Sequence, residues 1–190
     1  MAQADRDRWD AKYAARQAPE GLCPDEWLID EARDLAPARA LELACGLGHN
    51  AIWLASRGWQ VDALDISPVG LGQARDLAQI HGAQVNWIAA DLDDFVPVPE
   101  TYDLVIVFRF LDRHSLPRIV QEGLRPGARL CFESFTMAHT RRPDSHMRNP
   151  EFALESGELP RLFPRLEAAS YSECSLADRD VARFVGVKRP

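Results

Sequence analysis

Residues 41–50 read LELACGLGHN and place a short apolar strand directly before a glycine-rich turn. Residues 40–44 have the composition of a buried strand, and residues 50–57 are apolar at helical spacing. Gly46 and Gly48 lack the side chains that would keep a ligand away from the backbone, and glycine permits unusual φ values. In an open parallel sheet such a turn forms the floor of the ligand crevice. We therefore expect the turn to wrap a bulky nucleoside.

Strands and helices alternate on both sides of this turn. Charges surround apolar residues at helical spacing over residues 5–16 and 24–36, which predicts two helices before the first strand. Further strands are predicted at residues 60–64, 85–89, 104–108 and 129–135, and further helices at residues 67–80 and 116–124. Strands that are nearly continuous in apolar residues suit a parallel sheet covered by helices on both faces. The sequence predicts an α/β fold with a doubly wound, mostly parallel sheet of Rossmann-like type.

The pattern changes after the fifth predicted strand. A polar, proline-containing stretch is followed by a short predicted helix at residues 156–163. The strand-like runs at residues 166–174 and 181–187, joined through Asp178-Arg179-Asp180, predict a C-terminal antiparallel hairpin. We expect one domain over residues 1–190, in which residues 1–36 cover the site and residues 136–164 form an irregular substrate-side segment.

Composition narrows the classes of function. The chain has 190 residues, 46% of them hydrophobic, which is enough for one domain with a substantial core. The net charge of -7 makes general nucleic-acid binding unfavourable. No signal-peptide pattern starts the chain and no apolar stretch approaches ~20 residues, so we expect a cytoplasmic protein without membrane contact. Without CxxC spacing we expect no metal site, and free buried thiols at Cys23, Cys45, Cys131 and Cys174.

Two more strand ends carry residues suited to a nucleoside. Asp65 ends the second strand about twenty residues past the glycines, where a carboxylate accepts hydrogen bonds from vicinal ribose hydroxyls. Asp91 follows the third strand, where its carboxylate is placed to receive an adenine amino group while Leu92 and Ile66 cover the ring. Each feature alone has a structural explanation, as a packing turn, a helix-approach residue or a turn cap. Their order and spacing together favour one crevice.

At this point the chain resembles the class I S-adenosylmethionine (SAM)-dependent methyltransferases, from about Trp9 to its end. The resemblance rests on LELACGLGHN, VDALDIS, WIAADLDDF and YDLVIVFRFLDR. Within that family, residues 131–159 are similar to small enzymes of the tellurite-resistance and thiopurine types. Asn50 stands where many members have a third glycine. Because Asn tolerates left-handed backbone geometry, we expect that change to be minor.

The resemblance implies SAM as the cofactor and assigns most of its contacts. The residues implied to shape the methionine and ribose pocket are Glu42, Ala44, Gly46 and Gly48. Asp65 is then the ribose ligand, Asp91 and Leu92 hold adenine, and Phe108 with Arg109 lines the methyl-donor side. The implied reaction is methyl transfer to a small-molecule acceptor by in-line displacement.

The sequence also offers candidates for the remaining roles. His114 lies close enough to the predicted crevice to act as a base or to orient a substrate, with Arg109 beside it, although a cap or surface position explains His114 equally well. Arg141, Arg142 and Arg148 are candidates for binding an anionic acceptor, or they belong to a solvated loop. Trp9 and Tyr13 either meet the sulfonium through their aromatic faces or simply pack their helix.

Two other classes of function stay open. Residues 46–51 formally fit the GxGxxG/A pattern, and with Asp65 they would suit a nicotinamide-dependent oxidoreductase. Against that reading stand Glu42 inside the first strand, Asp91 at the third strand end and the final hairpin. A noncatalytic binding protein of the same fold is the second alternative. We expect a monomer or a homodimer.

Overall fold

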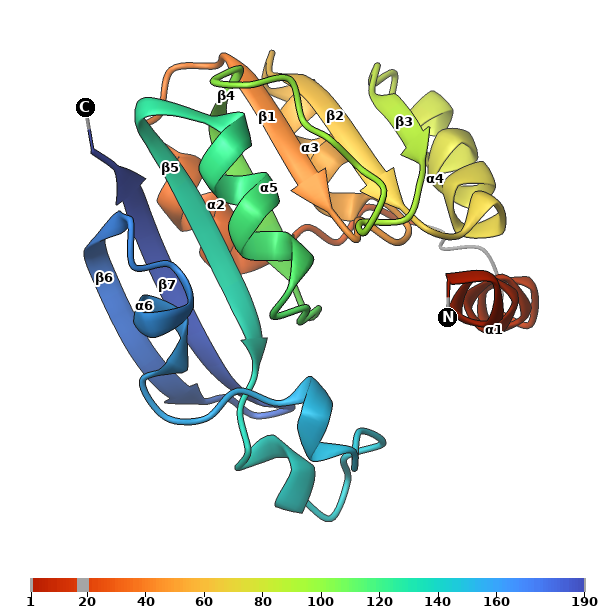
Figure 1. Cartoon of the computed structure of the whole chain (residues 1–190). Coiled ribbons are helices and arrows are strands. Elements are labelled where there is room, and N and C mark those ends of the chain that lie inside the picture. The colour runs from red at the N-terminus through yellow and green to blue at the C-terminus, as the bar shows by residue number, and fades with distance from the viewer. Residues whose placement is uncertain (1, 17–20, 190) are drawn as a thin grey trace. The chain divides into compact units, whose positions relative to one another are not determined.

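A computed structural model describes residues 2–16 and 21–189 of the chain (Figure 1). Contacts divide it into two compact units, Met1–Phe95 and Val96–Pro190, which are described separately. The expectation of a single domain over the whole chain stays a prediction.

The first unit contains the glycine-rich turn. Its helices are α1 Ala2–Ala14, α2 Glu26–Ala32, α3 His49–Ser56 and α4 Pro68–Ile80, and its strands are β1 Arg39–Leu43, β2 Gln60–Asp65 and β3 Asn86–Ala89. The strands are parallel in the order β3-β2-β1, and Leu43 is paired with Leu64 at the carboxyl ends of β1 and β2. The start of α4 is as predicted: Ser67 Oγ accepts a hydrogen bond from the Gly70 amide, with Pro68 in the first turn. The helix predicted at residues 24–36 is shorter in the structure, where α2 spans Glu26–Ala32.

The second unit contains the C-terminal hairpin. Its strands are β4 Tyr102–Phe108, β5 Leu124–Phe135, β6 Leu166–Ser175 and β7 Asp180–Lys188, and its helices are α5 Ser115–Gly123 and α6 Glu158–Leu162. Two 3₁₀ turns, η1 His139–Arg141 and η2 Pro150–Phe152, interrupt the irregular segment. β4 and β5 are parallel, whereas β7 pairs antiparallel with both β5 and β6. The parallel pairs and the antiparallel C-terminal strands confirm the predicted fold class.

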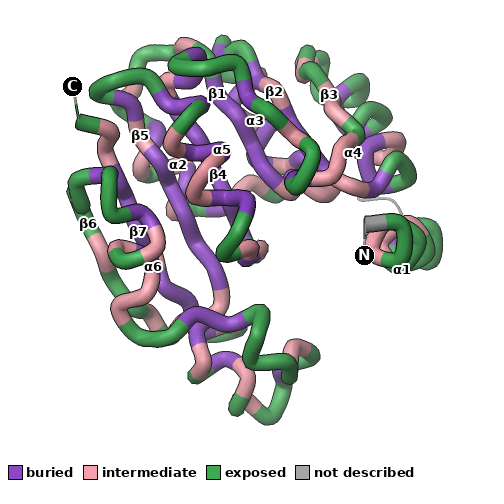
Figure 2. The backbone as a smooth tube through the Cα atoms, viewed as in Figure 1, coloured by how far each residue is buried: buried purple, intermediate pink, exposed green. Residues whose placement is uncertain are grey.

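Burial follows the prediction for the central strands. In Figure 2 the strands β1, β2 and β4 are largely buried, and the side chains from Leu104 to Val107 have no exposed surface. β6 is mostly exposed. The four cysteines are free, but the expectation that all are buried is wrong. Cys45 and Cys131 are buried in or beside strands, whereas Cys23 is exposed because it lies in the loop before α2.

Within residues 2–16 and 21–189, no helix is long and apolar enough to cross a membrane. In the same ranges no group of His, Cys, Asp or Glu side chains is arranged to hold a metal ion.

Candidate functional site

The glycine-rich turn between β1 and α3 has a backbone that most residues cannot adopt. Ala44, Gly46 and Gly48 have φ angles of 55°, 56° and 69°. A Cβ atom on Gly48 would lie 2.3 Å from the ring of Trp87, and one on Gly46 would lie 2.8 Å from the Tyr13 hydroxyl. Both glycines are therefore required by close approach as well as by conformation. This observation supports the turn as a place where other groups meet the backbone.

Asp65 lies at the end of β2, directly against this turn. Its carboxylate accepts hydrogen bonds from the Gly46 amide at 2.8 Å and from the Ser67 amide at 2.9 Å, and the residue is 6% exposed. Burial raises the pKa of Asp65; the hydrogen bonds from Ser67 and Gly46 oppose that rise, and the charge of Asp10 adds to it. Each carboxylate oxygen has two lone-pair sites. After the two amide bonds the carboxylate retains acceptor capacity toward hydroxyl groups.

Glu42 and Asn50 hold the framework around the turn. Glu42 is buried and accepts hydrogen bonds from the Ala51 amide at 2.9 Å and from Asn50 Nδ2 at 3.2 Å. Asn50 Oδ1 accepts from the Asp25 amide at 2.8 Å, which ties the start of α3 to the start of α2. Asp25 in turn caps α2 through the Trp27 amide. These bonds join segments far apart in the sequence.

We expected Asn50 to replace a glycine because Asn tolerates left-handed backbone geometry, and the structure shows that this reason is wrong. Asn50 lies inside α3 and is not among the residues with positive φ. The left-handed residues are Ala44 and the two glycines. Asn is used here for its amide, which both donates and accepts in a buried position.

The third strand end lies next to the second. The Ala90 amide donates to the Asp65 carbonyl at 3.1 Å, so the segments after β2 and β3 run together. Leu92 is buried and Ile66 is half-buried. Asp91 is half-buried, and its Oδ1 accepts from the Asp93 amide at 3.0 Å, as a turn cap does. The structure thus brings Asp65 and Asp91 to neighbouring strand ends, while an adenine role for Asp91 stays a prediction.

α1 brings Tyr13 onto the glycine-rich turn. Tyr13 is buried, its hydroxyl lies against Gly46, and a Cβ atom on Gly70 would lie 2.8 Å from its ring. Burial, and then the charges of Asp65 and Cys45, raise the pKa of Tyr13 above its ordinary value. The hydroxyl is therefore neutral at physiological pH and available as a donor.

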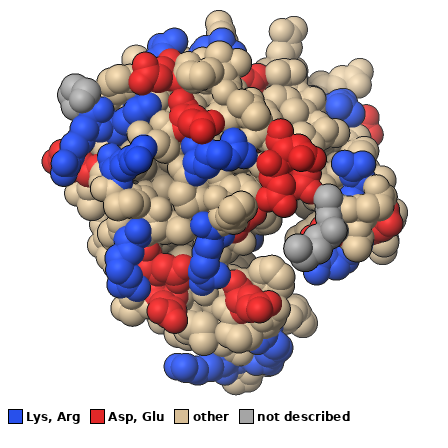
Figure 3. All heavy atoms as spheres, in the orientation of Figure 1, with Lys and Arg blue, Asp and Glu red and all other residues tan. Residues whose placement is uncertain are grey.

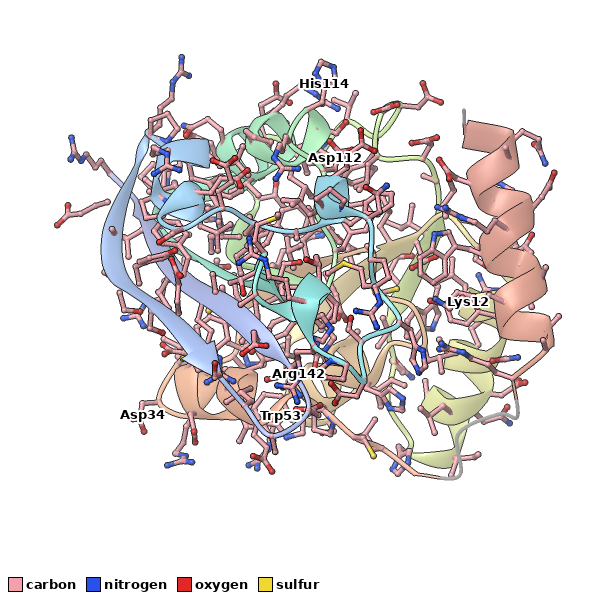
Figure 4. All side chains as sticks on the ribbon, turned by 90° about the horizontal axis from the view of Figure 1, so that it is seen from below. Lys12, Asp34, Trp53, Asp112, His114 and Arg142 are labelled. Carbon is pink, nitrogen blue, oxygen red and sulfur yellow. The ribbon has the colours of Figure 1, made fainter. Side chains whose placement is uncertain are left out.

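Trp9 lies behind Tyr13. The two rings stack with centroids 5.8 Å apart, and the Lys12 ammonium, labelled in Figure 4, is 4.1 Å from the Trp9 centroid. Burial, followed by repulsion from Arg16 and Arg8, lowers the pKa of Lys12. Arg8 also lies over the Trp9 ring, 5.9 Å from the centroid, and contact of Trp9 with a sulfonium stays a prediction.

In the second unit, the structure places Phe108 and Arg109 at the carboxyl end of β4. Phe108 is buried, and Arg109 is exposed with a φ of 56° and donates its amide to the Glu133 carbonyl at 2.8 Å. His114 is exposed at the start of α5, where its amide and that of Ser115 donate to Asp112 Oδ1. Asp112 is thus the capping group, and Figure 4 labels it with His114.

The arginines of the irregular segment differ from one another. Arg142 is half-buried and pairs with Asp144 at 3.1 Å and Asp180 at 3.5 Å. Arg148 donates to main-chain carbonyl groups of its own segment, among them that of Thr140 at 3.0 Å. Arg141 is exposed. The contacts of Arg142 and Arg148 are structural, and binding of an anionic acceptor by Arg141 and Arg142 stays a prediction.

Arg113 is a residue that the sequence analysis missed. Its guanidinium pairs with Glu158 at 2.6 Å and donates to the carbonyls of Glu151 at 2.7 Å and Ala153 at 2.9 Å. These bonds anchor the end of the irregular segment. No local sequence pattern predicts these bonds, because the partners of Arg113 lie far along the chain and two of them are main-chain carbonyls.

Surface charge is mixed in sign. On the face shown in Figure 3, Lys and Arg side chains alternate with Asp and Glu side chains. That distribution gives no single basic patch on this face for a phosphate backbone.

Comparison with known proteins agrees with the motifs. A family model described as a methyltransferase domain matches residues 40–127. Hemagglutinin 1 of Eikenella corrodens is 33% identical over 114 residues, covering 56% of this chain and 38% of that protein. The probable S-adenosyl-L-methionine-dependent methyltransferase TehB of Haemophilus influenzae is 25% identical over 97 residues, covering 50% of this chain and 34% of that protein. The matched stretch thus spans little more than a third of these relatives.

Solved structures share the fold over nearly the whole chain. The crystal structure of TehB superposes with a TM-score of 0.72 at 18% identity, covering 97% of this chain and 67% of that one. Magnesium protoporphyrin IX methyltransferase from Synechocystis PCC 6803 with bound SAM gives a TM-score of 0.70 at 17% identity, covering 98% of this chain and 96% of that one.

Residues 40–127 thus match a methyltransferase domain, and the chain has the fold of class I SAM-dependent methyltransferases. The resemblance predicted from the motifs is confirmed. TehB is similar to this chain in both sequence and structure.

Proposed function

We propose that this chain binds SAM at the glycine-rich turn and transfers its methyl group to a small-molecule acceptor. The observation that carries the proposal is the position of the Asp65 carboxylate, 2.8 Å from the Gly46 amide at the ends of two adjacent parallel strands. A carboxylate there offers paired acceptors to ribose hydroxyls, and the glycines allow a ligand close to the backbone. Both follow the carboxyl ends of parallel strands, the edge of the sheet at which open α/β folds bind nucleosides.

The residues of the first unit fit such a ligand. Gly46, Gly48 and Ala44 present backbone rather than bulky side chains. Asp65 would hold the ribose, while Asp91, Leu92 and Ile66 would contact adenine. Glu42 acts indirectly in this proposal, because its carboxylate already holds Ala51 and Asn50 and thereby fixes the turn. Tyr13 would cover the turn from α1, with Trp9 behind it.

Bound SAM supplies an electrophilic methyl carbon: the acceptor lone pair forms the new bond, and the sulfur–carbon electron pair stays on sulfur to give S-adenosylhomocysteine (SAH). The chain has to orient the acceptor and exclude water, and positioning of this kind contributes on the order of 7–11 kcal/mol in favourable model systems. Phe108 and Arg109 are proposed to line the acceptor side. His114 is the proposed base where the acceptor is a hydroxyl, and Arg141 with Arg142 is proposed to bind an anionic acceptor.

Calorimetric titration with SAM, SAH and NADH tests the cofactor. We expect the wild type to bind SAM and SAH, and Asp65→Asn to weaken both at least about tenfold, because hydrogen bonds to a charged group contribute ~1.5–3 kcal/mol. Asp62→Asn is the matched control, since Asp62 lies on the same strand but pairs with Arg39 and Asn86. Thermal unfolding of each variant verifies its fold.

The outcomes separate the three classes of function. Binding of NADH without SAM would replace the proposal by a nicotinamide-dependent oxidoreductase. SAM binding without transfer of labelled methyl to a panel of thiol, amine, hydroxyl and metalloid acceptors would favour a noncatalytic binding protein. Light scattering during gel filtration tests the accompanying proposal of a monomer or homodimer.

A further inference from the structure

Asp10 on α1 contacts the start of α4, although no motif drew attention to it. Its Oδ1 accepts a hydrogen bond from Ser67 Oγ and lies 3.3 Å from the Val69 amide. Ser67 Oγ also accepts from the Gly70 amide at 3.0 Å, so the same hydroxyl caps α4. A carboxylate at a helix N-terminus is favourable as well through the helix dipole. Asp10 is therefore a specific attachment of α1, formed across more than fifty residues of sequence.

Ser67, the partner of Asp10, also contacts Asp65, the proposed ribose ligand. The Ser67 amide donates to Asp65 Oδ1 at 2.9 Å, and Asp65 Oδ2 accepts from the Gly46 amide at 2.8 Å. Asp10, Ser67, Asp65 and Gly46 thus form one connected series of hydrogen-bonding residues from α1 to the glycine-rich turn. Through such a hydrogen-bond network, a shift of Asp10 can move the groups around Gly46.

On α1, Tyr13 packs against the same glycine-rich turn. Tyr13 lies three residues after Asp10 on the helix, its ring covers Gly70 and its hydroxyl lies against Gly46. Its carbonyl accepts a hydrogen bond from Gln73 Nε2 at 3.0 Å. The position of Tyr13 over the turn therefore depends on how α1 is docked against α4.

We propose that Asp10 is a positioning residue: by bonding Ser67 it docks α1 so that Tyr13 covers the glycine-rich turn, and it thereby couples docking of α1 to SAM binding. This inference rests on the proposed SAM site. Coupling between two binding events is reciprocal. Docked α1 must raise SAM affinity, and a bound ligand must in turn hold α1 in place.

Hydrogen exchange without any ligand tests the docking step by itself. We expect Asp10→Asn to speed amide exchange in α1, while Asp7→Asn leaves it unchanged. Asp7 is the matched control because it is exposed on the same helix and accepts a local hydrogen bond from Gln3 Nε2 at 2.7 Å. Unchanged exchange in Asp10→Asn would overturn the proposal.

Titration with SAH then tests the coupling. We expect Asp10→Asn to weaken SAH about five- to tenfold, Asp7→Asn to stay within twofold, and SAH to slow exchange in α1 of the wild type. In a double-mutant cycle, Asp10→Ala and Ser67→Ala should weaken SAH less than additively, because each removes the hydrogen bond between Ser67 Oγ and Asp10 Oδ1. Full additivity, or tighter SAH binding by Asp10→Asn, would contradict the proposal.

Two glycines of α4 provide a second test that leaves Asp10 intact. A Cβ atom on Gly70 would meet ring carbons of Tyr13 at 2.8 and 2.9 Å, whereas one on Gly72 would meet nothing within 4 Å. Gly70→Ala should displace Tyr13 and weaken SAH as Asp10→Asn does, while Gly72→Ala should bind normally. Equal affinities of the two variants would remove Tyr13 from the coupling.

The pH profile of SAH binding separates positioning from a general loss of structure. Asp10 and Tyr13 from α1 and Cys45 from the turn face Asp65, and the charge of Asp10 contributes to the raised pKa of Asp65. Removing that charge lowers the pKa, so the loss of affinity in acid should move to lower pH in Asp10→Asn. An unmoved profile would contradict the proposal.

Failure of the proposed function is recognised separately. If the wild type binds no SAH, both the SAM site and the coupling are overturned, and ligand-free exchange still decides whether Asp10 docks α1. If the wild type binds SAH and Asp10→Asn binds it equally well, only the coupling is overturned.

Discussion

The glycine-rich turn of the first unit and the irregular segment of the second unit are held in opposite ways. In the turn, backbone and rings approach so closely that a Cβ atom on Gly48 would lie 2.3 Å from Trp87. In the irregular segment, arginine side chains donate to main-chain carbonyls: Arg113 to those of Glu151 and Ala153, and Arg148 to that of Thr140. One is shaped by missing side chains and the other by long ones.

This difference explains which of the two regions can be recognised from sequence. A turn that requires absent side chains leaves glycines at fixed spacing after a strand, and that spacing is visible. A loop held by arginine leaves no comparable trace, because arginine is common on surfaces and a carbonyl acceptor belongs to any residue. The glycine-rich turn was therefore predictable from the sequence, and the contacts of the irregular segment were not.

The largest effect on stability is expected from adding a side chain to the glycine-rich turn. Gly48→Ala adds left-handed strain of roughly 1–2 kcal/mol and an overpacking cost of roughly 1–3 kcal/mol. We expect urea denaturation to show a loss of about 2–5 kcal/mol. Gly82→Ala is the control, because its φ of 63° is similar but a Cβ atom there meets nothing within 4 Å. Equal losses in both variants would mean that the contact with Trp87 is unimportant.

A smaller effect is expected from releasing the irregular segment. Arg113→Met retains the length of the side chain but removes its bonds to Glu158, Glu151 and Ala153. Because the Arg113 side chain is 41% exposed, we expect a loss of only about 1 kcal/mol, together with faster proteolysis within residues 136–158. Arg118→Met, which loses a surface pair with Glu122, should change neither. Unaltered proteolysis in Arg113→Met would show that other contacts hold the segment.

The smallest effect concerns pH. His139 is buried against Phe135, and burial lowers its pKa from 6.5, with Asp180 opposing and Arg142 assisting. Below pH 6.5 the unfolded chain binds a proton that the folded chain does not, so stability falls as pH decreases from 6.5 through the folded pKa. His139→Gln should reduce the slope of the unfolding free energy against pH between about 5 and 7, the range in which histidine ordinarily titrates. An identical slope in the variant would assign the acid sensitivity to other groups.

Local sequence determined the elements, the parallel strands and the family. Apolar runs mark buried strands, Ser67-Pro68 marks a helix start, and the glycines mark the turn after β1, because each requirement is met within a few residues. The left-handed backbone of Ala44, the amide bridge of Asn50 and the capping role of Asp112 were not foreseen. The amide bridge of Asn50 depends on Asp25 and Glu42, partners that a local pattern does not name.

Only the tertiary structure decided which side chains meet. Tyr13 lies over Gly46 because α1 docks on α4, and Asp10 reaches Ser67 for the same reason. Arg142, a candidate for substrate binding, pairs with Asp180 of β7. Contacts of this kind join residues tens of positions apart, and their free energy depends on three-dimensional packing rather than on the sequence around either partner.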